Sequence, residues 1–182
     1  MNESKISTRY SKAFIEFAAE KNLLEAAVED IRFILDICKM KDVMSMLESP
    51  VIQNSDKQKI IHLIIKDKIN QITFSFIDLV LKNNRGPYLK WICIRFIDRY
   101  KERKGIKSAF LKTVKEISNS QKQKLIKTVE HIYKSKIELE ELIDENILGG
   151  FILTVEDQQF DASIVSKLKK IKQELVNATF EN

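Results

Sequence analysis

The stretch NILGGFILTVEDQQFDASI, residues 146–164, decides how the second half of this chain is interpreted. It holds Gly149 and Gly150, two of only four glycines among 182 residues. A phosphate-binding loop needs glycines that lead into a helix N-terminus, where backbone N–H groups converge on the anion. Here the glycines lead instead into apolar residues at alternate positions: Phe151, Leu153 and Val155. Such alternation predicts a strand, and the pair before it predicts a turn, because glycine tolerates positive φ.

The residues before and after this turn continue a mixed pattern of strands and helices. Two more strands are predicted by alternation, one with Ala109, Leu111 and Thr113 inward and one with Ile137 and Leu139 inward. Ser120 and Gln123 have the spacing of a capping box, which predicts the start of a helix between those strands. The inward stripe of that helix is expected to be Leu125, Val129, Ile132 and Tyr133. A last helix is expected to bury Ile164, Leu168, Ile171 and Leu175.

The first hundred residues read as six amphipathic helices joined by short connections. Apolar residues recur at helical spacing in each, beginning with Ile6, Tyr10, Ala13, Phe14, Phe17 and Ala18. Pro50 and Pro87 interrupt the series, since proline and the residue before it disfavour a continuing helix. Ser55 and Gln58 suggest a capping box for the fourth helix, with Ile60, Ile61, Ile64 and Ile65 inward.

The fifth of these helices, in the stretch 71–84, is unusually apolar. Its apolar residues cover most of the circumference: Phe74, Phe76, Ile77, Leu79, Val80 and Leu81. A helix that is apolar nearly all round is either central or also faces a partner. Beside the first helix it could form a groove for another amphipathic helix, and burial in the core is the alternative.

These patterns predict a mainly α fold in two domains. Residues 1–105 are expected to form a six-helix bundle, and residues 106–182 a small α+β domain. The net charge of +5 lies wholly in the first part, which has 19 basic and 14 acidic residues against 12 and 12 in the second. Basic residues gather near its end: Arg85, Lys90, Arg95, Arg99, Lys101, Arg103 and Lys104. This run leaves open a helical nucleic-acid-binding protein, although such runs are more often a solvated helix face.

The sequence gives no sign of a catalytic, metal or cofactor site. His62 and His131 lie far apart, and neither has a partner at metal-ligand spacing. Cys38 and Cys93 stand among apolar residues at helical spacing, which predicts two buried thiols rather than a disulfide or a nucleophile. No run of about 18 apolar residues could span a membrane. From the residues alone we expect a two-domain interaction protein.

Five segments, in order, resemble the delta subunit of bacterial F-type ATP synthases, the counterpart of the mitochondrial oligomycin-sensitivity-conferring protein. The segments are RYSKAFIEFA, LESPVIQNSDKQKII, FIDLVLKNNR, YKERKGIKSAFLKTVKEIS and DENILGGFILTVEDQQFDASI. The last is the most specific, through Asp144, Leu148, Gly149, Gly150 and Asp161. It departs from the family at Ala162, where glycine is usual. The resemblance runs from about Arg9 to Leu175.

The resemblance implies a non-catalytic stator subunit in the peripheral stalk of a proton-translocating ATP synthase. In this family the helical bundle binds N-terminal segments of the alpha subunits, one of which lies between the first and fifth helices. The C-terminal domain binds the membrane-anchored b subunits. The expected location is therefore the cytoplasmic face of the bacterial plasma membrane, peripheral and without direct insertion, with no cofactor and no nucleic acid bound.

Carried onto this sequence, the resemblance names candidate binding and turn residues. The first-helix side of the alpha-binding groove would comprise Tyr10, Ala13, Phe14 and Phe17. The fifth-helix side would comprise Phe74, Ile77, Asp78 and Leu81. The structural turn of the second domain would involve Asp144, Gly149, Gly150 and Asp161. Which apolar residues face the groove and which face the core stays open at this point.

Overall fold

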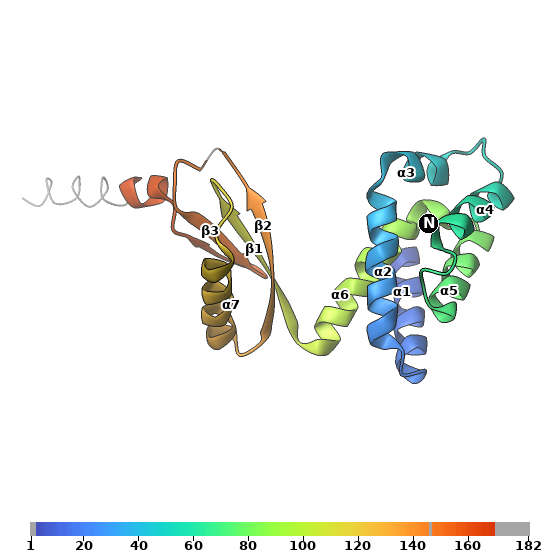
Figure 1. Cartoon of the computed structure of the whole chain (residues 1–182), viewed down its shortest axis with the longest axis horizontal. Coiled ribbons are helices and arrows are strands. Elements are labelled where there is room, and N and C mark those ends of the chain that lie inside the picture. Colours follow the sequence, from blue (N-terminus) through green and yellow to red (C-terminus); the bar gives the residue numbers. More distant parts are fainter. Residues whose placement is uncertain (1–2, 146, 170–182) are drawn as a thin grey trace, which may run out of the picture. The chain divides into compact units, whose positions relative to one another are not determined.

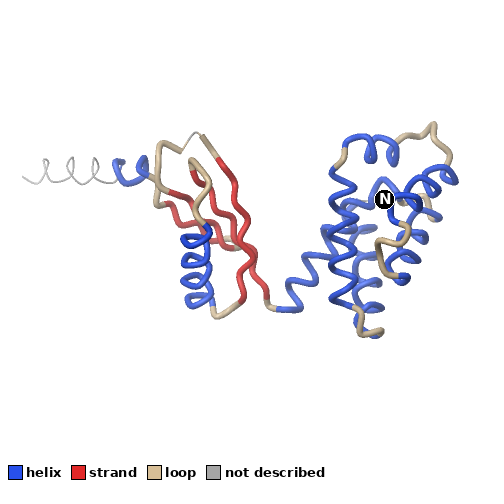
Figure 2. Tube along the Cα trace, in the orientation of Figure 1, coloured by secondary structure: helices blue, strands red, loops and turns tan. Residues whose placement is uncertain are grey.

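A computed structural model of the chain describes residues 3–145 and 147–169 (Figure 1). The chain divides into two compact units, Met1–Arg103 and Lys104–Asn182, and each is described by itself. Figure 2 shows that the first unit is built from helices and that the strands belong to the second. The predicted class, a mainly α chain with a helical bundle followed by a small α+β unit, is confirmed.

The N-terminal unit contains the six predicted helices in its described part. They are α1 (Glu3–Glu20), α2 (Leu24–Lys39), α3 (Lys41–Glu48), α4 (Asn54–Ile65), α5 (Gln71–Lys82) and α6 (Leu89–Lys104). A short 3-10 turn, η1 (Gly86–Tyr88), precedes α6 and carries Pro87. Proline suits that place because its fixed φ is preorganised for a helix start and its missing N–H would have no helical partner there.

Aromatic rings hold the centre of the bundle. The ring of Phe14 on α1 stacks on that of Phe76 on α5, with centroids 4.0 Å apart and planes at 6°. It also meets Phe96 on α6 at 5.1 Å. Phe14 and Phe96 are almost completely buried, as are Ile31 on α2 and Leu47 on α3. Buried side chains from several helices therefore meet inside the bundle, and their burial is the main stabilising term of the unit.

Several helix ends in the bundle are satisfied by residues from other helices. The carboxylate of Asp30 on α2 accepts hydrogen bonds from the backbone N–H of Asn70 (2.9 Å) and from Thr73 Oγ1 (2.6 Å), at the start of α5. At the other end of α5, Asn54 Nδ2 donates to the carbonyl oxygen of Leu81 (2.7 Å). The bonds to the Asn70 N–H and the Leu81 carbonyl pair backbone groups that a helix terminus leaves without intrahelical partners.

The structure corrects two details predicted for α4. Its N-cap is Gln53, without a side-chain capping bond, so the predicted Ser55–Gln58 capping box is wrong. Ile61 and Ile65 are buried as expected, but Ile60 is exposed. Helix α4 packs along a narrower stripe than the isoleucine-rich sequence suggested, because only residues four apart face the neighbouring helix.

The C-terminal unit is a four-stranded mixed sheet with one helix in its crossover. Its elements are β1 (Ile106–Thr113), α7 (Asn119–Tyr133), β2 (Lys136–Ile143), β3 (Phe151–Val155) and β4 (Gln158–Asp161). The strand order is β2-β1-β3-β4. Strands β1 and β2 pair in parallel, with Ala109 opposite Leu139, and α7 connects them. Strand β3 runs antiparallel to β1, with Leu111 opposite Leu153, and β4 extends the sheet antiparallel to β3.

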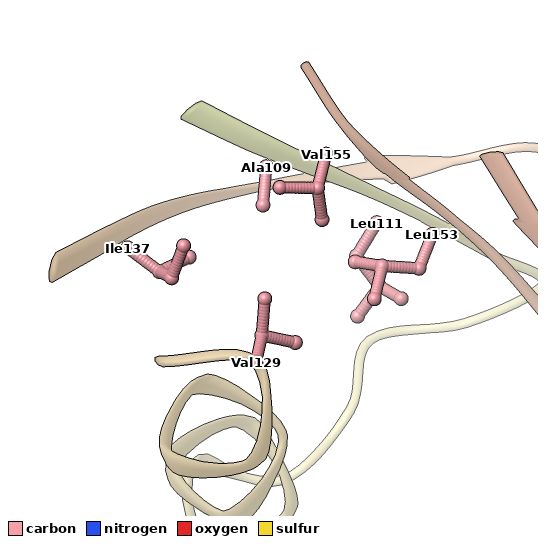
Figure 3. Close-up of a cluster of buried hydrophobic side chains, with 6 residues drawn as sticks. All are labelled: Ala109, Leu111, Val129, Ile137, Leu153 and Val155. Carbon is pink, nitrogen blue, oxygen red and sulfur yellow. The ribbon is translucent and has the colours of Figure 1, made fainter. Parts of the chain in front are cut away.

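The core of this unit lies between α7 and one face of the sheet. Figure 3 shows Val129 of α7 pointing toward residues of three strands. The buried cluster consists of Ala109, Leu111, Val129, Ile137, Leu153 and Val155, so the alternation predicted for these strands is confirmed. The helix stripe needs one correction: Ile132 is exposed, and Ile126 packs against the cluster instead. Helix α7 is capped by Ser118 with Gln121, two residues before the predicted pair Ser120 and Gln123.

Gly149 and Gly150 lie in the connection from β2 to β3, and both have positive φ, 152° and 82°. A Cβ on Gly150 would come within 2.4 Å of the carbonyl oxygen of Ala162 and 2.9 Å of Ser163 Cα. Glycine is therefore required at position 150 for two reasons: the positive φ, and the close approach of the backbone of Ala162 and Ser163. Asp144 opens this connection, and its backbone N–H donates to the carbonyl oxygen of Thr113 (2.9 Å).

Asp161 organises the chain after β4. One carboxylate oxygen accepts the backbone N–H of Ser163 (2.8 Å), and the other accepts Ser166 Oγ (2.6 Å). These hydrogen bonds to the charged form lower the pKa of the Asp161 carboxyl, the bond from Ser166 most. Residues 164–169 are helical, but Ile164 and Leu168 are largely exposed. The rest of the predicted final stripe, Ile171 and Leu175, lies outside the described residues.

Candidate partner-binding groove

A groove of about 830 Å³ runs between α1 and α5. Its α1 side is formed by residues at helical spacing: Ile6, Tyr10, Ala13, Phe14 and Phe17. Ala13 is exposed and small, whereas Phe14 lies beneath it and is 2% exposed. Phe17 is 43% exposed, so its ring stands at the surface of the groove. All four first-helix candidates, Tyr10, Ala13, Phe14 and Phe17, thus line one concave surface.

The α5 side of the groove is formed by different residues from those suggested by the resemblance. Ile72, Ser75, Phe76 and Leu79 line it, and Leu79 is 52% exposed. The floor is rigid, because Phe76 stacks on Phe14 and lies 6.5 Å from the Tyr10 ring. An apolar, preformed floor with partly exposed rims is the usual geometry for binding the apolar face of a helix.

The four candidates on the fifth helix, Phe74, Ile77, Asp78 and Leu81, do not line this groove, and their role in binding stays a prediction. Ile77 and Leu81 are fully buried in the bundle core. Phe74 faces α4, where its ring lies 4.7 Å from that of His62. Asp78 also faces α4, with one carboxylate oxygen 3.2 Å from His62 Nε2 and the other 2.8 Å from Lys82 Nζ.

A sequence pattern could have predicted which α5 residues line this groove. Ile72, Phe76 and Leu79 stand at positions i, i+4 and i+7, which is a single helical stripe. The pattern is ambiguous because α5 is apolar on several faces, so the sequence equally allows several apolar stripes to line a groove. Packing on α2 and α4 resolves the ambiguity by burying Ile77 and Leu81.

The rim of the groove is basic. Lys5 and Arg9 from α1 and Arg85 from the turn after α5 all line it, and no acidic residue does among those that the structure describes. Arg85 belongs to the basic run for which the sequence left nucleic-acid binding open. Cationic side chains around an apolar floor favour an amphipathic segment that carries acidic groups beside its apolar stripe, through complementary charge.

Among the described residues no group of three or more His, Cys, Asp or Glu could hold a metal ion. Burial raises the pKa of the Cys38 thiol to about 12 and that of Cys93 well above its usual range. Such thiols are poor nucleophiles, because the thiolate is the reactive form. No helix in the same part of the chain is long and apolar enough to cross a membrane.

The fold and the groove define a class of protein: a two-unit, helix-rich chain that presents an apolar groove with a basic rim. The sequence matches the ATP synthase delta (OSCP) subunit family over residues 6–175, and the chain therefore belongs to that family. It is 34% identical to ATP synthase subunit delta of Cytophaga hutchinsonii over 173 residues, 94% of each chain. It is 33% identical to the protein of the same name in Christiangramia forsetii, over 99% of this chain and 98% of that one.

A solved structure agrees in fold. One chain of the Toxoplasma gondii mitochondrial ATP synthase hexamer, determined by cryo-electron microscopy, superposes with a TM-score of 0.72 at 20% identity. The match covers 93% of this chain and 97% of the other. Family membership makes this chain a structural subunit of the ATP synthase complex. The comparisons give no support to the alternative of a nucleic-acid-binding protein.

Proposed function

We propose that this protein is a stator subunit of the peripheral stalk, which holds the catalytic head of ATP synthase to the membrane-anchored b subunits. In this proposal the N-terminal unit binds the N-terminal segment of an alpha subunit in the α1–α5 groove. The observation that carries it is the groove itself, with the stacked Phe14 and Phe76 as its floor and Lys5, Arg9 and Arg85 at its rim. The C-terminal unit binds the b subunits.

The task is mechanical, and the protein needs no catalytic site of its own for it. A stator resists torque through contacts that dissociate slowly, so buried apolar area matters more than fast encounter. Two units that grip two partners also raise each other's effective concentration, which slows release further. In the same proposal the protein lies on the cytoplasmic face of the bacterial plasma membrane, as a peripheral component of a proton-translocating enzyme.

Titration with a synthetic peptide of the cognate alpha-subunit N-terminus tests the alpha-binding part. Phe14 is unsuitable for a disruptive charge, because it is buried in the core as well as in the groove. Leu79→Asp is the sharper variant, since Leu79 lines the groove and is half exposed. Val51→Asp is the matched control, because Val51 is 86% exposed and lies outside the groove.

We expect the wild type and Val51→Asp to bind one peptide with equal affinity, and Leu79→Asp to bind more than about tenfold more weakly. Binding of the wild type should also weaken at higher salt, because the basic rim is solvent-exposed. Failure of the wild type to bind either the peptide or the purified catalytic head would refute the proposal. Circular dichroism of each variant establishes that the bundle is intact.

A further inference from the structure

The three cations on the rim of the α1–α5 groove all stand at one end of it. Helices α1 and α2 form a hairpin joined through residues 21–23, so α3 lies at the end of the bundle where α1 begins (Figure 1). The η1 turn contacts both α3 and α1. Arg85 directly precedes η1 and is thereby brought to the start of α1, where Lys5 and Arg9 stand. The groove therefore has a cationic end.

No carboxylate neutralises that end among the side chains that the structure describes. The described lining contains no acidic residue, and Lys5, Arg9 and Arg85 take part in no ion pair with a described side chain. At the other end of the groove, Lys21 Nζ lies 5.9 Å from the centroid of the Phe17 ring, but Lys21 does not belong to the lining. The field inside the groove therefore favours an anionic group at the start of α1.

Away from its cationic end the groove is apolar and already formed. The rings of Phe14 and Phe76 stack with centroids 4.0 Å apart and make a fixed floor. The hydroxyl of Ser75 donates to the carbonyl oxygen of Gln71 at 2.9 Å, within α5, so it has little left to offer a ligand. A preformed surface loses little conformational entropy when a ligand covers it. This part of the groove therefore favours an apolar chain.

The dimensions of the groove suit a small amphiphile. Its volume of about 830 Å³ falls in the range of small-molecule sites, roughly 300–1,000 Å³. Arg9 and Phe17 are eight residues apart on α1, which is about 12 Å along the helix axis. With carbon–carbon bonds of about 1.5 Å, an extended alkyl chain of about ten carbons covers that distance. One anionic group at the end of such a chain matches one cationic end beside an apolar floor.

We propose that the α1–α5 groove also binds the anion of a free long-chain fatty acid. The carboxylate lies among Lys5, Arg9 and Arg85, and the alkyl chain covers the stacked rings of Phe14 and Phe76. A partner helix covers the same floor, so the two ligands exclude each other. Binding of the fatty acid does not depend on the proposed function, whereas its consequence, that free fatty acid limits capture of the alpha segment, rests on it.

Isothermal titration of the full chain with fatty-acid anions, below their micelle concentrations, tests the site. Decanoate, dodecanoate and tetradecanoate vary the chain length, and tetradecyltrimethylammonium keeps the longest chain but reverses the charge of the head. Leu79→Asp alters the apolar lining, with the exposed Val51→Asp as its matched control. Arg9→Glu alters the cationic end, and Lys21→Glu makes the same charge change beyond the other end, outside the lining. Circular dichroism establishes that each variant is folded.

We expect one tetradecanoate to bind per chain, and each added methylene to tighten binding about fourfold, because it is buried against the floor. Leu79→Asp should weaken binding more than about tenfold, since it places a charge in the apolar lining, and Val51→Asp should leave binding unchanged. Arg9→Glu should weaken binding about fivefold and Lys21→Glu less than about twofold. The cationic amphiphile should bind more weakly than tetradecanoate.

The inference is overturned if tetradecanoate shows no saturable binding, if Leu79→Asp binds it like the wild type, or if the cationic amphiphile binds equally well. Equal losses from Arg9→Glu and Lys21→Glu would also overturn it, because the carboxylate would then have no preferred end. Vesicles of phosphatidylglycerol provide a further comparison. Binding to them that is tighter than binding to free tetradecanoate and insensitive to Leu79→Asp would replace the fatty-acid site with a membrane surface.

Competition with the alpha-subunit peptide separates this inference from the proposed function. Saturating tetradecanoate should displace a fluorescent alpha peptide from the wild type, as measured by anisotropy. A peptide that binds and is not displaced overturns the inference and leaves the proposed function standing. A peptide that does not bind, together with tetradecanoate titrations that follow the expected pattern, removes the alpha segment from this groove and leaves the fatty-acid site standing.

Discussion

The helical bundle and the sheet domain bury their apolar residues in different ways. In the bundle, apolar residues from several helices pack together, with Phe14 stacked on Phe76 and meeting Phe96 at a tilt. In the sheet domain, one face packs on α7, while Phe110 and Leu142 of the opposite face remain about half exposed. The bundle therefore completes its own core, whereas the sheet domain keeps apolar side chains exposed on its second face.

The same contrast appears in the backbone. The ends of α5 are tied by Asp30 and Asn54, which come from other helices. The sheet domain relies more on local devices, such as the Ser118–Gln121 capping box and the Asp161 turn, beside longer-range contacts such as the hydrogen bond from Tyr133 to Gln158. Hydrogen bonds between residues far apart in the sequence make a unit unfold cooperatively. A unit that relies more on local hydrogen bonds depends on its small apolar core for stability. We therefore expect the bundle to be the more stable unit, and five experiments sharpen or break that comparison.

The largest effect is expected for Phe14→Ala. This change removes a buried ring that stacks on Phe76 and contacts Phe96, and cavities of that kind cost about 3–5 kcal/mol. Urea unfolding followed by circular dichroism measures the free energy of unfolding. Phe17→Ala, on the same helix but 43% exposed, is the control and should cost well under half as much. Equal losses from the two variants would show that the aromatic stack does not hold the bundle together.

Gly150→Ala should have the next largest effect, confined to the sheet domain. The new Cβ would clash with the carbonyl oxygen of Ala162, and φ of 82° is unfavourable for alanine, so we expect a loss of about 3 kcal/mol. Gly105→Ala is the control, because its φ of 64° is also positive but nothing lies near the added carbon. It should cost only about 1 kcal/mol. Thermal unfolding measures both, and a Gly105 variant as damaged as the Gly150 variant would point to conformation alone.

Ser118→Ala should cost about 1 kcal/mol, because it removes the side-chain acceptor for the N–H of Gln121 at the start of α7. Ser120→Ala is the matched control, two residues further on and exposed inside the helix. It should leave stability nearly unchanged. A larger loss from Ser120 than from Ser118 would restore the capping position predicted from the sequence and contradict the observed one.

A further prediction concerns pH and the two thiols of the bundle. The folded pKa of Cys38 is about 12, above its ordinary value of 9.0, because burial disfavours the thiolate. The folded state therefore keeps a proton that the unfolded state releases, and this contribution to stability is full below pH 9 and lost as pH rises toward 12. Bundle stability measured by urea unfolding should accordingly fall across that interval.

Thiol titration also separates the two units, since Cys38 and Cys93 both lie in the bundle. At pH 8 neither should react with Ellman's reagent in the folded protein. If the sheet domain unfolds first on heating, the thiols should stay unreactive through that step and react only when the bundle opens. Reaction of either thiol during the first step would show that the two units do not unfold in the expected order.

Much of the fold could be predicted because periodicity is local information. The helical stripes and the alternation of Ala109 and Leu111 follow from repeats of 3.6 and 2 residues. Strand β4 was missed because Gln158 to Asp161 is exposed at every position, so it has no buried alternation to reveal it. Strand β4 forms because its backbone hydrogen-bonds to the edge of β3. In the groove, the first-helix residues were predicted and the fifth-helix residues were not.

The sequence by itself determined where the helices and the strands other than β4 lie, that Gly149 and Gly150 form a connection, and which family the chain resembles. Only the tertiary structure decided which face of α5 is core and which is groove, because α5 is apolar on several faces and its own period cannot choose among them. Packing against the other helices decides between these faces: it buries Ile77 and Leu81, and it leaves Phe76 and Leu79 to line the groove beside α1. Contacts between segments far apart in the chain make that choice, and no local pattern contains them.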